Sequence, residues 1–211
     1  MRTTHRIVLF MLVSLSMAAW AVAQTEGIKE TDRFIKTGRA TSQSVAEARL
    51  KTKNALDAYN LLVQGSSKDM KGDYKKLLST EKTMNNQVAE VRKVIAEMEK
   101  QAAVYFTSRA RAVDQIKDND LRDQGKSRVN DSQKEYDKVI AALKEGGEAL
   151  TPFASDLSDQ IKYLGAELTP SATASLQPQA TKLNERGSTL LTQVDTAVST
   201  ANTYFSTLKA E

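Results

Sequence analysis

The side chains of this sequence that could do chemistry are almost all carboxylates, lysines, tyrosines and hydroxyls. The chain has no cysteine, and its one histidine, His5, lies in an N-terminal segment that we expect to be removed. The remaining chain cannot form Ser-His-Asp or Cys-His catalytic sites, disulfides, or zinc sites built from histidine and cysteine. We therefore predict no catalytic residue, no cofactor and no metal site, although carboxylate, lysine, tyrosine or serine chemistry and oxygen-ligand cation sites stay possible.

Two groups of carboxylates are candidates for a site. Glu81 interrupts an apolar helical layer opposite Leu157, where a carboxylate with a raised pKa could be functional. We interpret it instead as a side chain that reaches solvent or pairs with a nearby lysine. Glu145, Glu148 and Asp156 lie near an expected bend, but their spacing is not that of an EF-hand loop. We interpret this second group as a solvated face.

A third group of charges is the strongest candidate for a binding site. Residues 106–132 are expected to form the tip of a helical hairpin, and basic residues alternate there with aspartates. A solvated hairpin end explains this mixture, and so does a docking surface for a protein, a cell-wall polymer or a lipid headgroup. The aspartates are Asp114, Asp118, Asp120 and Asp123. The basic residues that we assign to partner docking are Arg109, Arg111, Lys117, Arg122, Lys126 and Arg128.

A seven-residue repeat indicates the elements that position these residues. Apolar side chains recur every seven positions from Met70 to Ala112, and a second series, offset by four positions, begins at Tyr74. This repeat predicts one long helix over residues 70–117 with a coiled-coil-like seam. A similar pair of series, beginning at Val129, predicts another long helix over residues 121–168.

Glycines and a proline lie inside the second of these helices. The phase of the repeat continues through Gly146-Gly147 and Pro152, whereas a true break would usually reset it. Proline removes one backbone hydrogen bond and kinks a helix without always ending it. We therefore expect one bent helix rather than two separate ones.

Two further helices flank this pair. Thr169 is a candidate N-cap and Pro170 suits the first position of a helix over residues 170–209, whose regular start Pro178 is expected to bend or delay. The helix expected over residues 27–64 has a less regular repeat, because Thr41 and Thr52 occupy its seam.

Short turns join these helices, so neighbouring helices must run antiparallel. The predicted fold class is all-α: an elongated antiparallel helical bundle, or coiled coil, of about four long helices with a protruding two-helix hairpin tip. Each layer of side chains in the tip contains a polar member, and the flanking helices end near its base. We expect the tip to open locally while the base of the bundle stays closed.

The N-terminus has the three parts of a secretory signal peptide. Basic residues precede an apolar run from Ile7 to Trp20, and Ala21-Val22-Ala23 fits the small-x-small rule for cleavage. We expect cleavage of residues 1–23 after Ala23, which leaves residues 24–211 as a single helical domain. A retained N-terminal anchor is the alternative, although the apolar run is short for a membrane span.

Export sets the expected location and partners. The cleaved protein would be periplasmic or secreted and would have no transmembrane segment. Its net charge falls from +4 to +2 when Arg2 and Arg6 are lost, a mild excess that predicts no nucleic-acid partner. The expected partner is a protein or another component of the cell envelope.

The chain also carries residues that resemble a known family. The match includes Asp159-Gln160, Leu164, Leu168, Ala172-Thr173-Ala174-Ser175-Leu176, the segment "VAEAR" at 45–49, and Pro152. On these residues most of the chain after the signal peptide resembles the bacterial exported proteins grouped as domain of unknown function 2959. The family has a Lys-His pair where Gly165-Ala166 stand here, so any role of that histidine is absent. The resemblance implies a helical exported protein and supplies no function.

Three functional hypotheses follow from these observations. The first is an exported, non-enzymatic coiled-coil protein that scaffolds, spaces or adapts components of the bacterial envelope. The alternative is a periplasmic holdase-like chaperone that grips unfolded clients, for which the expected mark is an exposed apolar inner face. An enzyme is disfavoured, because histidine, cysteine and a convergent polar cluster are missing. The sequence leaves the oligomeric state open.

Overall fold

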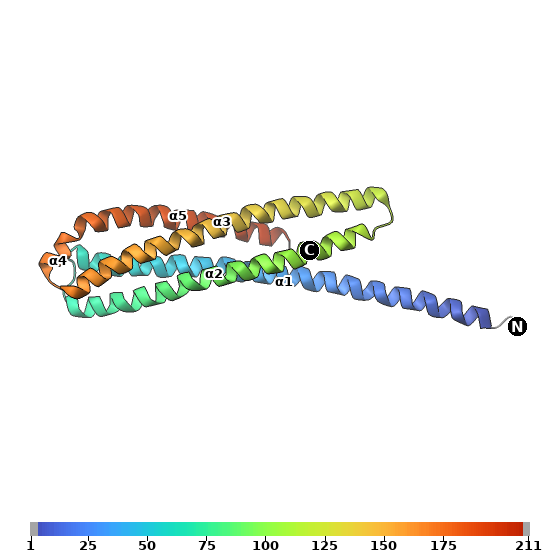
Figure 1. Cartoon of the computed structure of the whole chain (residues 1–211), viewed down its shortest axis with the longest axis horizontal. Helices are drawn as coiled ribbons and strands as arrows, with labels where there is room; N and C mark the ends of the chain where they lie inside the picture. Colours follow the sequence, from blue (N-terminus) through green and yellow to red (C-terminus); the bar gives the residue numbers. More distant parts are fainter. Residues whose placement is uncertain (1–3, 209–211) are drawn as a thin grey trace.

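The computed structural model describes the backbone of residues 4–208 and the side chains of residues 27–208. Within this part of the chain every element is an α-helix, which confirms the all-α prediction. Four long helices lie along one axis, and a short helix fills a corner at one end (Figure 1). The helices are α1 (Thr4–Val63), α2 (Met70–Asp114), α3 (Asn119–Ala166), α4 (Pro170–Ser175) and α5 (Gln177–Thr207).

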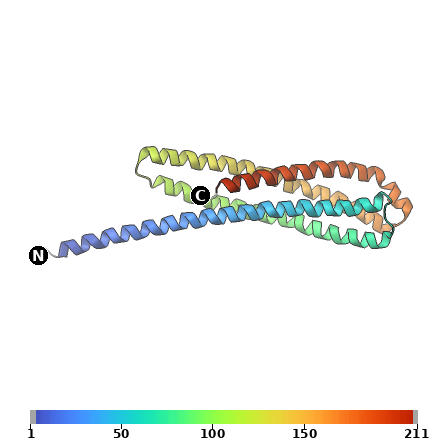
Figure 2. The ribbon, with the colours of Figure 1, turned by 180° about the vertical axis from the view of Figure 1, so that it is seen from behind.

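α1 begins well before the helix that was expected over residues 27–64. It runs from Thr4 to Val63 and passes Ala23 without a break. Its first part extends beyond the other helices (Figure 2). Of the predicted signal peptide, residues 1–3 lie outside the described residues and the side chains before residue 27 are not described, so cleavage after Ala23 stays a prediction.

Local chemistry sets the helix ends. The carboxylates of Asp69 and Asp118 accept hydrogen bonds of 3.0 Å from backbone N–H groups in the first turns of α2 and α3. Thr169 does the same for α4 at 3.2 Å, and Pro170 occupies the first turn, as predicted. After α1, Gly65 adopts a φ of 70°, a left-handed conformation that glycine tolerates without a steric penalty.

The helix expected over residues 170–209 is in fact two helices. α4 ends at Ser175, Leu176 lies between, and α5 starts at Gln177. Pro178 cannot donate a backbone hydrogen bond to the carbonyl of Ala174, and its ring would clash with that carbonyl in a continuous helix. The proline therefore separates two helices. The turn between α2 and α3 covers residues 115–118, so α2 ends and α3 begins slightly earlier than expected.

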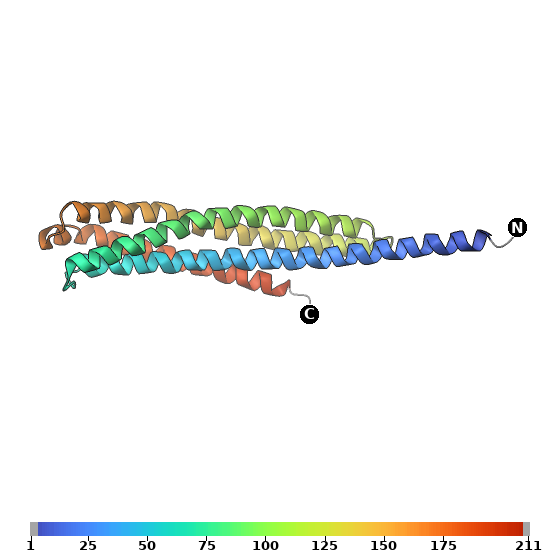
Figure 3. The same cartoon turned by 90° about the horizontal axis from the view of Figure 1, so that it is seen from below.

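Each long helix packs against two neighbours, α1 and α3 each contacting both α2 and α5. The same arrangement is visible from below (Figure 3). Polar contacts fix how α1 and α5 pair: Asn60 and Asn184 exchange amide hydrogen bonds of 2.7 and 2.9 Å, and Ser42 donates to Asn202 at 2.7 Å. Both pairs fit one antiparallel register, which a slip of either helix would break.

The predicted seams form the hydrophobic core. Leu77, Met84 and Met98 of α2 and Leu143 and Leu150 of α3 are fully buried. These side chains belong to the seven-residue series, so the repeat identified the buried faces of both helices. Their burial supplies the main stabilisation of a bundle that has no disulfide.

The two threonines in the α1 seam are buried, and the hydroxyl of each makes a hydrogen bond. Thr41 donates to the carbonyl of Thr37 at 2.9 Å, and Thr52 donates to that of Ala48 at 2.8 Å. Bonding to the preceding turn of the same helix lets these polar residues occupy core positions.

α3 passes through Pro152 as one helix, as the phase of the repeat predicted. Close packing explains one of the nearby glycines. A Cβ at Gly147 would lie 2.8 Å from Cγ1 of Val91, so glycine at this position allows α2 to approach the backbone of α3.

Six aromatic side chains form a layer where α5 ends. We call Phe34, Tyr105, Phe106, Tyr136, Tyr204 and Phe205 the aromatic layer; they come from α1, α2, α3 and α5, and all are buried. The rings of Phe34 and Tyr105 stack with centroids 4.2 Å apart, and the remaining rings meet edge-on or tilted. The aromatic layer closes the four-helix part of the bundle.

Candidate functional site

The tip that carries the candidate residues begins directly beyond the aromatic layer. No side chain from residue 107 to residue 128 is buried, and α2 and α3 continue there past the end of α5 (Figure 1). The tip was expected to cover residues 106–132, but Phe106 and Val129 are buried in the core. Phe106 packs within the aromatic layer and Val129 belongs to the same hydrophobic core, so the tip is residues 107–128.

Three of the six basic residues assigned to docking make contacts within the bundle, and two of these three hold the hairpin together. Lys126 of α3 forms an ion pair of 3.0 Å with Asp114 of α2. Arg122 donates to the backbone carbonyl of Ile116 at 3.2 Å and also bonds the side chain of Asn119. These contacts close the turn and join the two helices of the tip.

The third of these residues covers the aromatic layer. Arg109 donates to the hydroxyl of Tyr105 at 3.1 Å, and its guanidinium lies 5.5 Å from the centre of the Tyr105 ring. The cation is attracted to the ring face. Arg109 therefore has a structural contact that its position in the repeat did not reveal.

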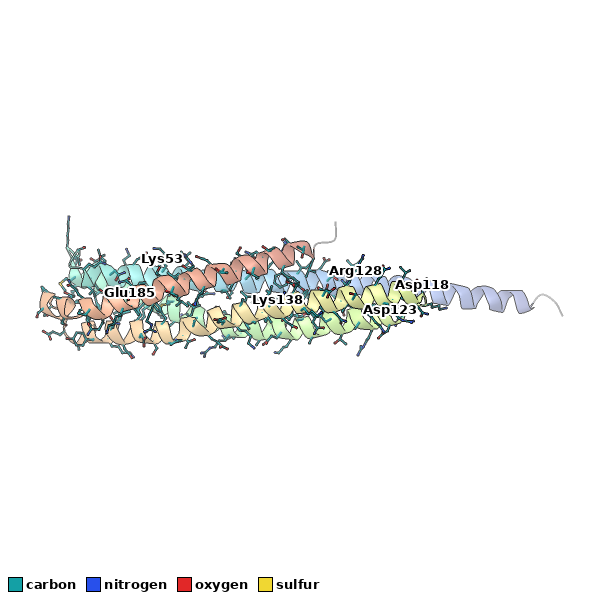
Figure 4. The ribbon with its side chains drawn as sticks, turned by 90° about the horizontal axis from the view of Figure 1, so that it is seen from above. Lys53, Asp118, Asp123, Arg128, Lys138 and Glu185 are labelled. Atoms are coloured by element: carbon teal, nitrogen blue, oxygen red, sulfur yellow. The ribbon has the colours of Figure 1, made fainter. Side chains whose placement is uncertain are left out.

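The other three basic residues are free for a partner. Arg111, Lys117 and Arg128 are exposed, and none makes an ion pair or hydrogen bond with a residue that the structure describes. Figure 4 shows Arg128 on α3 beyond the end of α5, with Asp118 and Asp123 nearer the turn. The structure thus divides the predicted set into three engaged and three unengaged cations.

Charge is unevenly distributed along the tip. Next to the aromatic layer, residues 107–113 and 124–128 carry four basic and no acidic side chains. The end of the hairpin, residues 114–123, carries four aspartates and two basic side chains. An anionic partner is therefore attracted to the side of the tip and repelled from its extreme end.

The other carboxylate candidates do not converge on a site. Glu81 is half-buried on α2; burial, and then the nearby charge of Glu81, raises the pKa of Tyr74. Asp156 pairs with Arg186 of α5, while Glu145 and Glu148 are exposed. In the described part of the chain no group of side chains could hold a metal ion. Among residues 27–208, whose side chains the structure describes, no helix is long and apolar enough to cross a membrane.

Two exposed apolar residues near the tip were missed by the sequence reasoning. Ile28 of α1 is 63% exposed and Leu121 of α3 is 57% exposed, the highest fractions among the large hydrophobic side chains described. Ile28 stands seven residues before the buried Ile35, so the seven-residue spacing could have marked it. Its exposure depends on where α5 ends, which the spacing does not reveal.

Comparison with known proteins identifies one family. The family model described as "Protein of unknown function (DUF2959)" matches residues 20–208. This match covers most of the chain and confirms the resemblance seen in the sequence. No curated protein and no solved structure matches the chain.

Proposed function

The chain belongs to the DUF2959 family, and we propose that it is an exported, non-enzymatic protein that docks a component of the bacterial envelope through its tip. In this role the bundle acts as a spacer or adaptor. The observation that carries the proposal is the tip itself: a two-helix segment with no buried side chain, mounted on a closed core and bearing three unengaged cations.

The architecture suits an adaptor. Contacts at the base, such as Asn60–Asn184, hold the long helices in one register, so the tip projects from a defined body. The side of the tip concentrates basic charge within a few turns of helix. Charged groups at such a surface increase the rate and selectivity of docking with a complementary partner.

The chaperone alternative has less support. A holdase was expected to present an exposed apolar inner face, but the inner faces of α1, α2, α3 and α5 are buried against each other in the described part of the chain. The large apolar side chains exposed there are few and mostly isolated, such as Leu50, Leu78 and Tyr163. We therefore favour docking of a defined partner over capture of unfolded chains.

A paired pull-down tests the proposed function. Arg111, Lys117 and Arg128 are changed together to serine, and the purified variant is incubated with envelope extract under mild cross-linking. The control changes Lys75, Lys76 and Lys82, three exposed lysines at the base of α2 for which no contact is described, to serine.

We expect the tip variant to lose the partner that the unchanged protein captures, and the control variant to keep it. Both variants should melt within about 2 °C of the unchanged protein, because exposed substitutions cost little stability. Equal capture by both variants would show that the tip is not the docking surface. A broad set of unfolded clients would favour the chaperone instead.

A further inference from the structure

α5 is shorter than its neighbours and does not reach along the tip. α5 ends at Thr207, level with the aromatic layer, whereas α1, α2 and α3 all continue beyond it (Figures 1 and 3). Among the residues that the structure describes, no helix continues the line of α5 next to the tip. We call this position, bordered by Ile28, Leu121 and Arg128, the open corner.

The α1 side of the open corner continues the face that holds α5. Ser42 donates to Asn202 of α5, and Ile35, seven residues earlier, is only 8% exposed. Seven residues make about two helical turns, so Ile28 lies on nearly the same side of α1 as Ile35 and Ser42. Ile28 is exposed because α5 does not extend over it.

On α3, the face that contacts α5 also continues past the end of α5. The carbonyl and hydroxyl of Ser132 both contact the hydroxyl of Tyr204 on α5, at 3.1 and 3.2 Å. Arg128 stands one turn before Ser132 and Leu121 about three turns before it, so both lie on this side of α3. The two most exposed large hydrophobic residues described and one unengaged cation therefore border a single corner.

We propose that the open corner is a seat for an amphipathic helix of a partner protein. The helix continues the line of α5, places apolar residues against Ile28 and Leu121, and carries an acidic residue opposite Arg128. This inference rests on the proposed function, since the helix would belong to the docking partner.

Two observations favour a helix over other occupants. The open corner is continuous with the interface that α1 and α3 already form with α5. The residues that border it are spaced by whole helical turns from residues that pack near or bond α5: Ile28 from Ile35 on α1, and Arg128 and Leu121 from Ser132 on α3. From Ser132 to Leu121 it is about 16 Å long, which matches roughly three turns of helix. A sugar polymer or lipid headgroup would use Arg128 but would leave Ile28 and Leu121 without apolar contacts.

Two synthetic peptides test the seat directly. Both are 14-residue helices with the same leucine seam, and they differ only at the position that faces Arg128, which is glutamate in one peptide and lysine in the other. Binding to the purified protein is measured by fluorescence anisotropy. We expect the glutamate peptide to bind about tenfold more tightly, which corresponds to one well-placed charge contact.

Single substitutions test the charged contact and the apolar contacts of the open corner separately. Arg128→Ser should remove the preference for the glutamate peptide, and Ile28→Ser or Leu121→Ser should weaken both peptides severalfold. Leu78→Ser, at another exposed leucine far from the tip, is the control and should change nothing. Equal affinity for the two peptides, or binding unaffected by Ile28→Ser and Leu121→Ser, would overturn the proposal.

Other outcomes distinguish the seat from the proposed function. If neither peptide binds while the Arg111, Lys117 and Arg128 variant still loses its envelope partner, the seat is wrong and the docking function stands. If the peptides bind as expected and that variant keeps its partner, the envelope function fails instead. A dimer in sedimentation that Leu121→Ser abolishes would assign the corner to a second copy of the chain and overturn the partner-protein proposal.

Discussion

Buried tyrosines show how single side chains depend on their place in the bundle. Tyr204 donates to the backbone of Ser132, and Tyr59 bonds Gln160 across the core. Burial raises the pKa of Tyr204 to about 12 and raises the pKa values of Tyr59 and Tyr136 well above the ordinary range. These hydroxyls must stay protonated in the folded protein, because an ionised phenol would be poorly solvated there.

This burial predicts a loss of stability at alkaline pH. The protonated Tyr204 hydroxyl contributes fully to the free energy of unfolding below pH 10, the ordinary tyrosine pKa. This contribution is lost as the pH rises through about 12, the pKa of Tyr204 in the folded protein. We expect the melting temperature, followed by circular dichroism, to fall steeply between these values. Tyr204→Phe should lower stability at pH 7 slightly but make the alkaline fall shallower. An identical pH profile for this variant would contradict the assignment.

A second prediction at this scale concerns the core register. Leu150 is fully buried, so Leu150→Asp would place an unpaired charge in a central layer and should destabilise the bundle by about 3 kcal/mol or more. Leu78→Asp, at a leucine that is 41% exposed, is the control and should cost much less. Thermal melts compare the two. An unchanged melting temperature for Leu150→Asp would refute the assigned register.

At the scale of the elements, the sequence was most informative where one pattern ran for many turns. The seven-residue series predicted α2 and α3 and their buried faces, and the unbroken phase predicted that α3 continues through Pro152. The helix ends were harder, because they depend on short-range features. The division between α4 and α5 at Leu176 is one example.

The base of the tip could not be located from the repeat alone. Polar members in the layers beyond residue 105 suggested that the seam ended there, but Phe106 and Val129 are buried. Phe106 packs against rings from other helices, Phe34 and Tyr136, and the place where these rings meet follows from the registers of the helices. The charged residues of the tip were found from sequence, whereas their division into engaged and free cations required the three-dimensional contacts.

Helix packing at the aromatic layer leads to a third prediction. A Cβ at Gly38 would overlap the ring of Phe205, which is fully buried. Helix propensity alone would make Gly38→Ala stabilising by about 1 kcal/mol. We expect the opposite: displacement of the ring and a loss of about 2 kcal/mol.

Gly27 provides the matched control for this prediction. It lies on the same helix, and a Cβ there would meet nothing within 4 Å. Gly27→Ala should therefore be neutral or slightly stabilising in a chemical denaturation experiment. If Gly38→Ala were as stable as Gly27→Ala, the close approach of α1 and α5 at this layer would be wrong.

At the scale of the whole molecule, a stable bundle carries a sparsely packed tip. In the four-helix part each long helix packs against two neighbours, whereas the described side chains of the tip include none that is buried. Local opening requires little free energy where few apolar contacts must be broken. This contrast between a rigid body and an easily opened tip is the basis of the proposed docking function.

The predicted export defines which form of the molecule works in the cell. The basic, apolar and Ala-Val-Ala segments predict that the periplasmic form begins at Gln24. Intact mass spectrometry of protein from a periplasmic fraction should show a species that lacks residues 1–23. A species that retains Met1 would contradict cleavage and would favour the retained anchor.

Hydrogen exchange resolved by residue, with and without the captured envelope partner, would show whether the tip opens in the free protein and whether the partner orders it. In the free protein we predict fast exchange across residues 107–128 and slow exchange at Val88 and Leu150. When the partner is added, exchange in the tip should slow while that of the base stays the same. Tip protection equal to that of Val88 and Leu150 in the free protein, or a tip unaffected by the partner, would contradict the account.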